Sequence, residues 1–288
     1  MNAPLNAAVE SESRQGGAGW SARLTLGFER RGGRTVLAER RHQGPLRVQK
    51  ALYPEGDEVC QVILIHPPAG IAGGDDLRVE VTVGRGAWAQ VTTPGAGKWY
   101  RSAGPSASLT QRVVVEPGGV CEWVPQESIV FDGALGSAKL EVDLAPDAVF
   151  VGMETICLGR TGSGERFSRG SLRLETRLRR QGRTIWLERG RIDGGGGLMG
   201  SPAGLAGATV AATMIVAGPE VDADCLARCR QIDAGEGQGT LTCPPGILVA
   251  RYLGPNSESA RRWLLALWRE LRPVMVGRPG MVPRIWNT

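Results

Sequence analysis

The sequence contains 288 residues, of which 42% are apolar and 22% charged, a balance that is ordinary for a folded globular protein. Its 42 glycines and 18 prolines, with only 5% aromatic residues, interrupt the chain too often for a helical bundle and favour short strands joined by turns. The formal net charge is +5, but the arginines are spread along the chain without a dense run among aromatics, which argues against a nucleic-acid groove.

The first 18 residues are small and polar, and they predict a disordered tail ahead of one folded domain over 19–288. From Trp20 to Phe28 apolar and polar residues alternate, which is typical of a half-buried strand. The glycine pair at 32–33 then turns the chain into 35–39. We therefore expect a hairpin at the start of the domain.

The same pattern of two alternating stretches around a turn occurs four more times. These units are 77–91, 109–124, 140–150 and 172–187. Five hairpin-like units predict a mainly β protein with mainly antiparallel strands, built either as stacked sheets or as a solenoid-like coil. The units are not alike enough in sequence to form a true repeat.

Two segments near the C-terminus favour helix. The first covers 220–232 and the second 257–271. In the second, apolar residues recur at helical spacing on one face: Trp263, Leu264, Leu267, Trp268 and Leu271. Asn256 or Ser257 is expected to cap its N-terminus and Pro273 to end it. This face is expected to pack against a sheet rather than to bind a partner.

The residues needed for common catalytic sites are sparse. His42 and His66 are the only histidines, and the sequence has neither a G-x-S-x-G elbow nor a P-loop motif. The glycine-rich segment 66–76 could present backbone N–H groups to an anion, but Asp75 and Asp76 would repel one. The alternative is a rigid reversal in which Asp75 accepts hydrogen bonds from turn amides.

Metal-ligating residues are present but do not form a closed set. Cys225 and Cys229 would share one face of a helix, with Cys243 as a third ligand, although buried structural thiols explain them more simply. His66 with Asp75 and Asp76 would suit nickel only weakly. No resident metal is therefore expected, and any metal would pass through.

The sequence also predicts the compartment. The six cysteines contain no CxxC pair, and the N-terminus has neither a basic nor an apolar region typical of a secretory signal. No apolar run approaches the roughly 20 residues of a membrane helix. These features predict a cytoplasmic protein with free thiols and no membrane partner.

Seven unusual strings occur in order along the chain. They are GPLRVQKALYPEG from Gly44, HPPAGIAGGD from His66, TTPGAGKWYRS from Thr92, EWVPQESIVFDGA from Glu122, CLGRTGSGERF from Cys157, RYLG from Arg251 and PRIWNT from Pro283. Together they resemble the urease accessory protein family UreD, called UreH in some lineages. The resemblance runs from about Trp20 to the last residue.

The resemblance implies a scaffold or chaperone that is not an enzyme. Members of this family bind UreF, which recruits the GTPase UreG, and the assembly docks on apo-urease. GTP hydrolysis in UreG then drives nickel insertion, and a water-filled passage through the UreD-like subunit is proposed as the nickel route. The implied cofactor is therefore transient Ni²⁺ rather than a resident metal.

Acidic residues inside the family strings are the candidate nickel path. They are Glu58, Asp75 and Glu165, with Cys60 and His66 as weaker metal candidates. Each carboxylate could instead be structural and cap a turn. The sequence also departs from the family pattern at Ala69, Ala72 and Gly97, where a glycine, a larger apolar residue and a hydroxyl residue are common.

Two segments are candidate contact surfaces. The first is a basic and aromatic cluster formed by Lys98, Trp99, Tyr100 and Arg101, a combination that anchors many interfaces but also packs internally. The second is the terminal segment with Arg284, Ile285 and Trp286, which is apolar enough to dock on this chain or on UreF.

Two other functions remain possible from the residues alone. A basic β-sheet module could bind an acidic partner or nucleic acid through arginine, with an affinity that falls steeply with salt. A metal-dependent hydrolase could use His66 with Asp75 and Asp76, which would require a tightly held metal.

Overall fold

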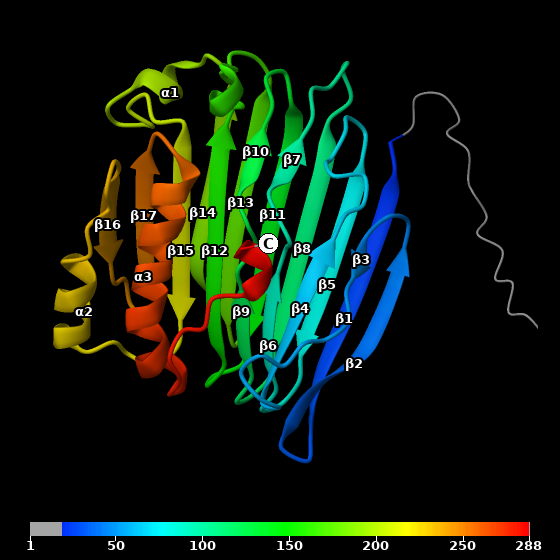
Figure 1. Ribbon diagram of the computed structural model, residues 1–288, viewed down its shortest axis with the longest axis vertical. Helices are drawn as coiled ribbons and strands as arrows, with labels where there is room; N and C mark the ends of the chain where they lie inside the picture. The colour runs from blue at the N-terminus through cyan, green and yellow to red at the C-terminus, as the bar shows by residue number, and fades with distance from the viewer. Residues whose placement is uncertain (1–18, 288) are drawn as a thin grey trace, which may run out of the picture.

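The computed structural model describes residues 19–287, so the predicted disordered tail at 1–18 lies outside the described residues. The described chain is mainly β and forms two sheets that lie face to face (Figure 1). One sheet has seven strands in the order β14 (Arg183–Asp193), β13 (Ser171–Arg180), β11 (Leu135–Leu144), β8 (Ala107–Val115), β5 (Asp76–Val83), β1 (Ser21–Arg31) and β2 (Arg34–Gln43).

The other sheet has ten strands. Its main path runs through β16 (Gln238–Thr242), β17 (Leu248–Gly254), β15 (Val210–Ala217), β12 (Val149–Leu158), β9 (Val120–Trp123), β6 (Trp88–Thr92), β4 (Val59–Ile65) and β3 (Arg47–Val48). Two short strands, β7 (Gly97–Trp99) and β10 (Ser128–Val130), pair beside β12.

The chain passes repeatedly from one sheet to the other. From β5 it crosses to β6, from β8 to β9, and from β11 to β12. Neighbouring strands within each sheet then run parallel, as in β5 with β8 and in β6 with β9. This coil around a shared interior confirms the mainly β, solenoid-like fold class.

For three of the five predicted hairpins, the prediction that the two strands pair with each other is wrong. The units 77–91, 109–124 and 140–150 each place their two strands in opposite sheets, where they pair in parallel with other units. The alternation of apolar and polar residues along a strand shows which side chains face the interior. This alternation is the same whichever of the two sheets the strand joins. The two outer units are true antiparallel hairpins, β1 with β2 and β13 with β14, as predicted.

The inward faces of the sheets form the larger apolar core. Ala22, Leu24, Leu26 and Phe28 of β1 are almost fully buried in it. Strand β6 is buried along its whole length, because one face meets this core and the other is covered by later parts of the chain. Burial on both faces is typical of strands within parallel sheets.

Three α-helices lie in the last third of the described chain: α1 (Gly197–Gly200), α2 (Ala223–Arg230) and α3 (Ser257–Val276). Short 3₁₀ turns occupy Thr161–Ser163 and Arg284–Asn287. Helices α2 and α3 confirm the two predicted helices, whereas α1 is a single turn that the sequence pattern did not predict. Within residues 19–287, no helix has the length and apolar character needed to cross a membrane.

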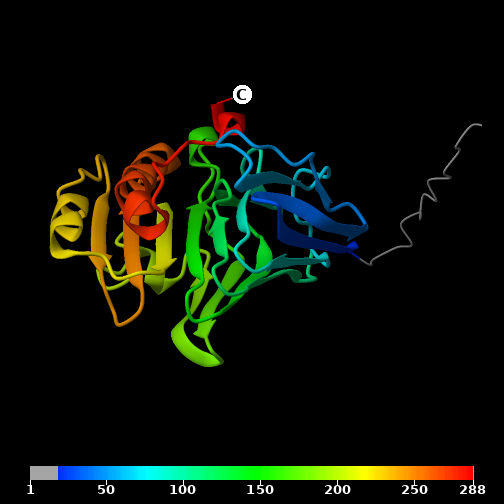
Figure 2. The same cartoon turned by 90° about the horizontal axis from the view of Figure 1, so that it is seen from below.

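Helix α3 covers the outer face of the ten-stranded sheet, as Figure 2 shows from below. Its apolar face packs into a second core, where Leu267 is fully buried and Trp263 and Trp268 are nearly so. This confirms packing against a sheet. Asn256 caps the N-terminus by accepting a 2.8 Å hydrogen bond from the Ser259 N–H.

The prediction that Pro273 ends this helix is wrong, because the helix continues through Val276. The carbonyl of Pro273 accepts a 2.9 Å hydrogen bond from the N–H of Gly277, which adopts a left-handed conformation with φ of 69°. Glycine is favoured in that conformation, so the helix end is set by Gly277 rather than by the proline.

Candidate functional site

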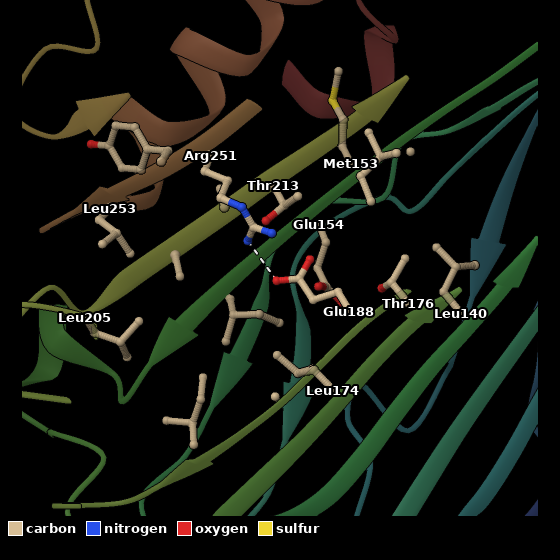
Figure 3. A pocket seen from close by; sticks show the side chains of 18 of the residues that line it. Leu140, Met153, Glu154, Leu174, Thr176, Glu188, Leu205, Thr213, Arg251 and Leu253 are labelled. Carbon is tan, nitrogen blue, oxygen red and sulfur yellow. Dashed lines mark hydrogen bonds and ion pairs between the residues drawn. The ribbon is translucent and has the colours of Figure 1, made fainter. Parts of the chain in front are cut away.

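A cavity of about 400 Å³ lies between the two sheets, where β13 and β14 face β12, β15 and β17 (Figure 3). Most of its lining is apolar. The charged residues that line it are Glu154, Glu188, Arg191 and Arg251. A largely apolar cavity with a few converging polar groups is the usual form of a binding site.

An ion pair crosses this cavity from one sheet to the other. Arg251 on β17 donates a 2.8 Å hydrogen bond from Nη1 to Oε1 of Glu188 on β14. The guanidinium of Arg251 also lies over the ring of Trp186, at 5.8 Å from the ring centroid. The pair therefore connects the two sheets at the place where they enclose the cavity.

Glu154 on β12 is the other carboxyl group in the cavity, and Figure 3 shows it beside Glu188. Burial and, to a smaller extent, the negative charge of Glu188 together raise the pKa of Glu154 to about 7. Glu154 therefore changes charge close to neutral pH. Glu154 is not among the residues predicted from the sequence, although a single carboxylate within the apolar run of β12 is a usable signal.

The three candidate nickel-path carboxylates lie in three different settings, outside the lining of this cavity. Glu58 pairs with Arg30 at 3.3 Å and with Arg278, and these contacts lower its pKa, the hydrogen bond from Arg30 most of all. It lies just before β4. A role for Glu58 in nickel passage stays a prediction.

Asp75 and Glu165 both accept backbone hydrogen bonds in turns. Asp75 accepts 2.8 Å bonds from the N–H groups of Trp20 and Ala72, which is the rigid reversal considered from the sequence. Glu165 accepts from the N–H of Asp132 at 3.2 Å and from Arg160 at 2.7 Å. These contacts fit the structural alternative, and a role in nickel passage stays a prediction for both.

Of the weaker metal candidates, Cys60 is buried and His66 is half-buried. Cys60 is fully buried in β4, and burial raises the pKa of its thiol. His66 follows β4, and its Nε2 atom is buried without a hydrogen-bond partner in the described chain. Burial lowers the pKa of His66, which the charge of Asp75 only partly offsets. The three residues of the alternative hydrolase site, His66, Asp75 and Asp76, do not form a metal site in the described chain. Asp76 is instead hydrogen-bonded by Ser108 and Arg78.

The cysteines do not complete a metal site. Cys225 and Cys229 are buried on one face of α2, as predicted, but Cys243 is exposed. Burial raises the pKa of Cys229 to about 12, so its thiol stays protonated. No group of three or more histidine, cysteine, aspartate or glutamate side chains suited to a metal occurs between Gly19 and Asn287.

The basic and aromatic cluster is divided between core and surface. Trp99 is 3% exposed and lies in the core, where Gly136 makes room for it, since a Cβ there would lie 2.6 Å from the ring. Tyr100 packs edge-on against Phe131, with ring centroids 5.2 Å apart. Of the cluster, Arg101 is the most exposed and Lys98 is half-buried, so these two are better placed for a partner than Trp99.

The terminal segment packs against its own chain. Trp286 is half-buried, and its Nε1 donates a 2.8 Å hydrogen bond to Oγ1 of Thr92 on β6. Arg284 remains exposed, and Ile285 is half-buried. The segment therefore packs on this chain, and docking on UreF stays a prediction.

A buried polar network joins α3 to the ten-stranded sheet. Arg272 binds Glu122 through two hydrogen bonds of 2.9 and 3.0 Å, and Glu122 also accepts from Trp88 and Trp268. Glu55 is the second partner of Arg272. Burial alone would lower the pKa of Arg272, but these two carboxylates outweigh it, so the pKa is raised. The predictions made from the sequence do not include this network.

Asp132 connects two loops, the one that follows β10 and the one that precedes β13. Its carboxylate accepts 2.8 Å bonds from the N–H groups of Ser168 and Arg169 and from the Arg169 guanidinium. The Arg169 side chain is the largest cause of a lowered Asp132 pKa. A lowered pKa in the folded state means that this stabilisation is complete above the unfolded value of about 4 and is lost as pH falls through the folded pKa.

Replacing Asp132 with asparagine is therefore expected to lower the free energy of unfolding by about 1–3 kcal/mol at neutral pH. The difference from the wild type should shrink as pH falls below about 4. Urea denaturation over a pH series measures both. Asp57→Asn is the control, because Asp57 forms an exposed pair with Arg34, and it should change stability by less than about 1 kcal/mol. A pH-independent effect of Asp132→Asn would contradict this account.

The chain is similar to known proteins over most of its length. The pattern of the UreD urease accessory protein family matches residues 21–287. The chain is 60% identical over 270 residues to the urease accessory protein UreD of Azoarcus sp. (strain BH72), covering 94% of this chain and 95% of that protein. The chain is 54% identical over 273 residues to the protein of the same name from Dechloromonas aromatica, and the match covers 93% of this chain and 95% of that protein. That from Pseudomonas fluorescens is 49% identical over 288 residues, covering both chains completely.

Proposed function

The chain belongs to the UreD family of urease accessory proteins, and from this membership we propose that it acts as a non-enzymatic scaffold in urease maturation. It binds UreF, UreF recruits the GTPase UreG, and the assembly docks on apo-urease in the cytoplasm. GTP hydrolysis by UreG drives the insertion of nickel. The observation that carries this proposal is the family match over residues 21–287, which spans both sheets and α3.

The second part of the proposal is that nickel passes through this subunit as cargo. The cavity between the sheets supports it, because the carboxyl groups of Glu154 and Glu188 offer oxygen ligands inside a space large enough for water. The candidates for the places where nickel enters or leaves the passage remain Glu58, Asp75 and Glu165. Two carboxylates do not close a coordination sphere, so an ion here would exchange rather than stay.

Association with UreF tests the scaffold directly. The purified chain and UreF from the same organism are expected to form a stable complex at micromolar concentration, as measured by size-exclusion chromatography with light scattering. The complex should show no hydrolytic activity of its own. If the two purified chains remain separate at micromolar concentration, the scaffold proposal is wrong.

A pair of variants locates the contact. Arg101 and Arg23 are both exposed arginines with one ion pair each, to Asp132 and Glu80 respectively. Arg101→Glu should weaken the complex by roughly tenfold or more if the loop around Arg101 contacts UreF, whereas Arg23→Glu should leave it unchanged. Equal affinities for both variants would remove this loop from the interface without removing the scaffold.

A further inference from the structure

We propose that the free edge of β14 is a docking site for an acidic, extended segment of a partner protein, which pairs with β14 as an added strand. The inference rests on the proposed scaffold role and names the chemistry of one protein that the scaffold holds. The site is an edge of the seven-stranded sheet rather than the interior between the sheets.

Strand β14 is the last strand of its sheet and pairs with β13 alone in the described chain. Along 183–192, no backbone group that points away from β13 has a backbone partner among the described residues. Figure 2 shows this hairpin, in yellow-green, at the margin of the molecule. A free edge of 11 residues is a template on which another strand can form backbone hydrogen bonds.

The hairpin of β13 and β14 carries most of the net charge of the protein. Its two strands contain seven arginines and three acidic residues, so its formal charge is +4, whereas the whole chain has +5. One of the seven, Arg180, donates to backbone carbonyls of the turn at 145–148 and is structural. The other arginines give the hairpin a surface that attracts acidic groups.

The outward-facing side chains of the hairpin form three cross-strand pairs. They are Arg173 with Arg191, Glu175 with Arg189 and Arg177 with Leu187. The first pair places two positive charges directly opposite each other, which is unfavourable. Asp193 pairs with Arg191 at 2.8 Å, but Arg173 forms no ion pair within the described residues. An acidic residue placed beside Arg191 by an added strand would reduce this repulsion.

The acidic residues on this face are too few to neutralise the arginines. Glu175 is shared by three cations, Lys139, Arg177 and Arg189. The Nε atom of Arg177 is buried and has no hydrogen-bond partner in the described chain. The side chains of Arg189 and Arg191 are 60% and 55% exposed, so they can turn to a new partner. Carboxylates of that partner would form charge-assisted hydrogen bonds with them.

Leu187 adds an apolar contact to the same face of β14. It is 46% exposed and lies in line with Arg189 and Arg191, because residues two apart in a strand share a face. A matching strand therefore has two acidic residues opposite the arginines and an apolar residue opposite Leu187. A second copy of this chain does not fit, since two hairpins of +4 charge would repel each other.

Nucleic acid fits this edge less well than an acidic protein segment. Glu175, Glu188 and Asp193 lie among the arginines of the hairpin and would repel phosphates. The one tryptophan of the hairpin, Trp186, is half-buried under the guanidinium of Arg251 and is not free to stack on a base. The observations therefore favour a protein partner.

Fluorescence anisotropy with the full-length chain tests the proposal. The probe is a labelled, capped peptide of alternating glutamate and valine that is long enough to span β14, and its affinity should fall as salt rises. Arg189→Gln combined with Arg191→Gln should weaken binding by roughly tenfold or more. Arg40→Gln combined with Arg41→Gln is the matched control, because it removes the same charge from β2 at the other edge of the sheet, and it should leave binding unchanged.

Further probes separate strand addition from attraction by charge alone and from a folding artefact. In two versions of the peptide, the backbone nitrogen of every glutamate or of every valine is methylated. The version whose methyl groups face β14 should lose most of its affinity, and the other should keep it. Arg189→Glu combined with Arg191→Glu should gain binding to a peptide of alternating lysine and valine, a gain that requires a folded edge.

The proposal is wrong if the Arg189→Gln and Arg191→Gln variant binds the probe as tightly as the wild type, or if the two methylated peptides bind equally well. A DNA duplex that binds more tightly than the peptide and is lost in the same variant would assign this surface to nucleic acid instead. The assay contains neither UreF nor urease, whereas the scaffold is tested by association with UreF. A failure of the strand site is therefore distinct from a failure of the proposed function.

Discussion

Replacing Arg272 with alanine is expected to lower the free energy of unfolding by about 3–5 kcal/mol. The Arg272 side chain is fully buried, and its partners Glu55 and Glu122 are 5% and 1% exposed. Its guanidinium also lies 5.0 Å from the ring centroid of Trp88 and 4.9 Å from that of Trp268. Without Arg272 both carboxylates would remain buried and uncompensated, which is the main cost.

Chemical denaturation with urea measures this effect, followed by tryptophan fluorescence and circular dichroism. The matched control is Arg262→Ala in the same helix, because Arg262 forms an exposed pair with Glu258 one turn away. The control should change stability by less than about 0.5 kcal/mol beyond helix propensity. If Arg272→Ala were no more destabilising than Arg262→Ala, the buried network would not hold α3 on the sheet.

The same residue shows what the sequence could and could not predict. Helical spacing predicted α3 and its buried face, and Arg272 lies four residues after Trp268 on that face. A charged residue on an apolar face signals a buried partner. The sequence did not identify that partner, because Glu122 lies 150 positions away on β9.

The fold was predictable as far as local alternation allows. Alternation identified the inward residues of β1 and β5, and turn residues located the hairpins β1–β2 and β13–β14. It did not separate a hairpin from a crossing between sheets, because both connect two strands with the same inward pattern. The parallel pairing of β5 with β8 depends on contacts between distant strands.

The cavity was less predictable than the turns. The alternative in which Asp75 accepts turn amides could be drawn from the sequence, because the contact is local: Ala72 lies three residues away. Glu154, Glu188 and Arg251 come from three strands in two sheets, and only the order of the strands places them around one cavity. Neither spacing nor composition contains that information.

Removing this chain from cells that keep urease and all its other accessory proteins is expected to abolish urease activation. Under the proposed function, UreG and UreF would lose both the scaffold that holds them on apo-urease and the route for the ion. Activity and nickel content of the enzyme should therefore fall together. Cells expressing Glu80→Gln in place of the wild type are the control and should retain full activation, because Glu80 lies on the outer face away from the cavity.

The decisive measurement is the nickel content of urease purified from cells with and without this chain, at the same nickel supply, beside its activity. The account predicts nickel-poor, inactive urease without the chain and restoration of both by the wild-type gene. Urease that is fully loaded with nickel in its absence would contradict the account.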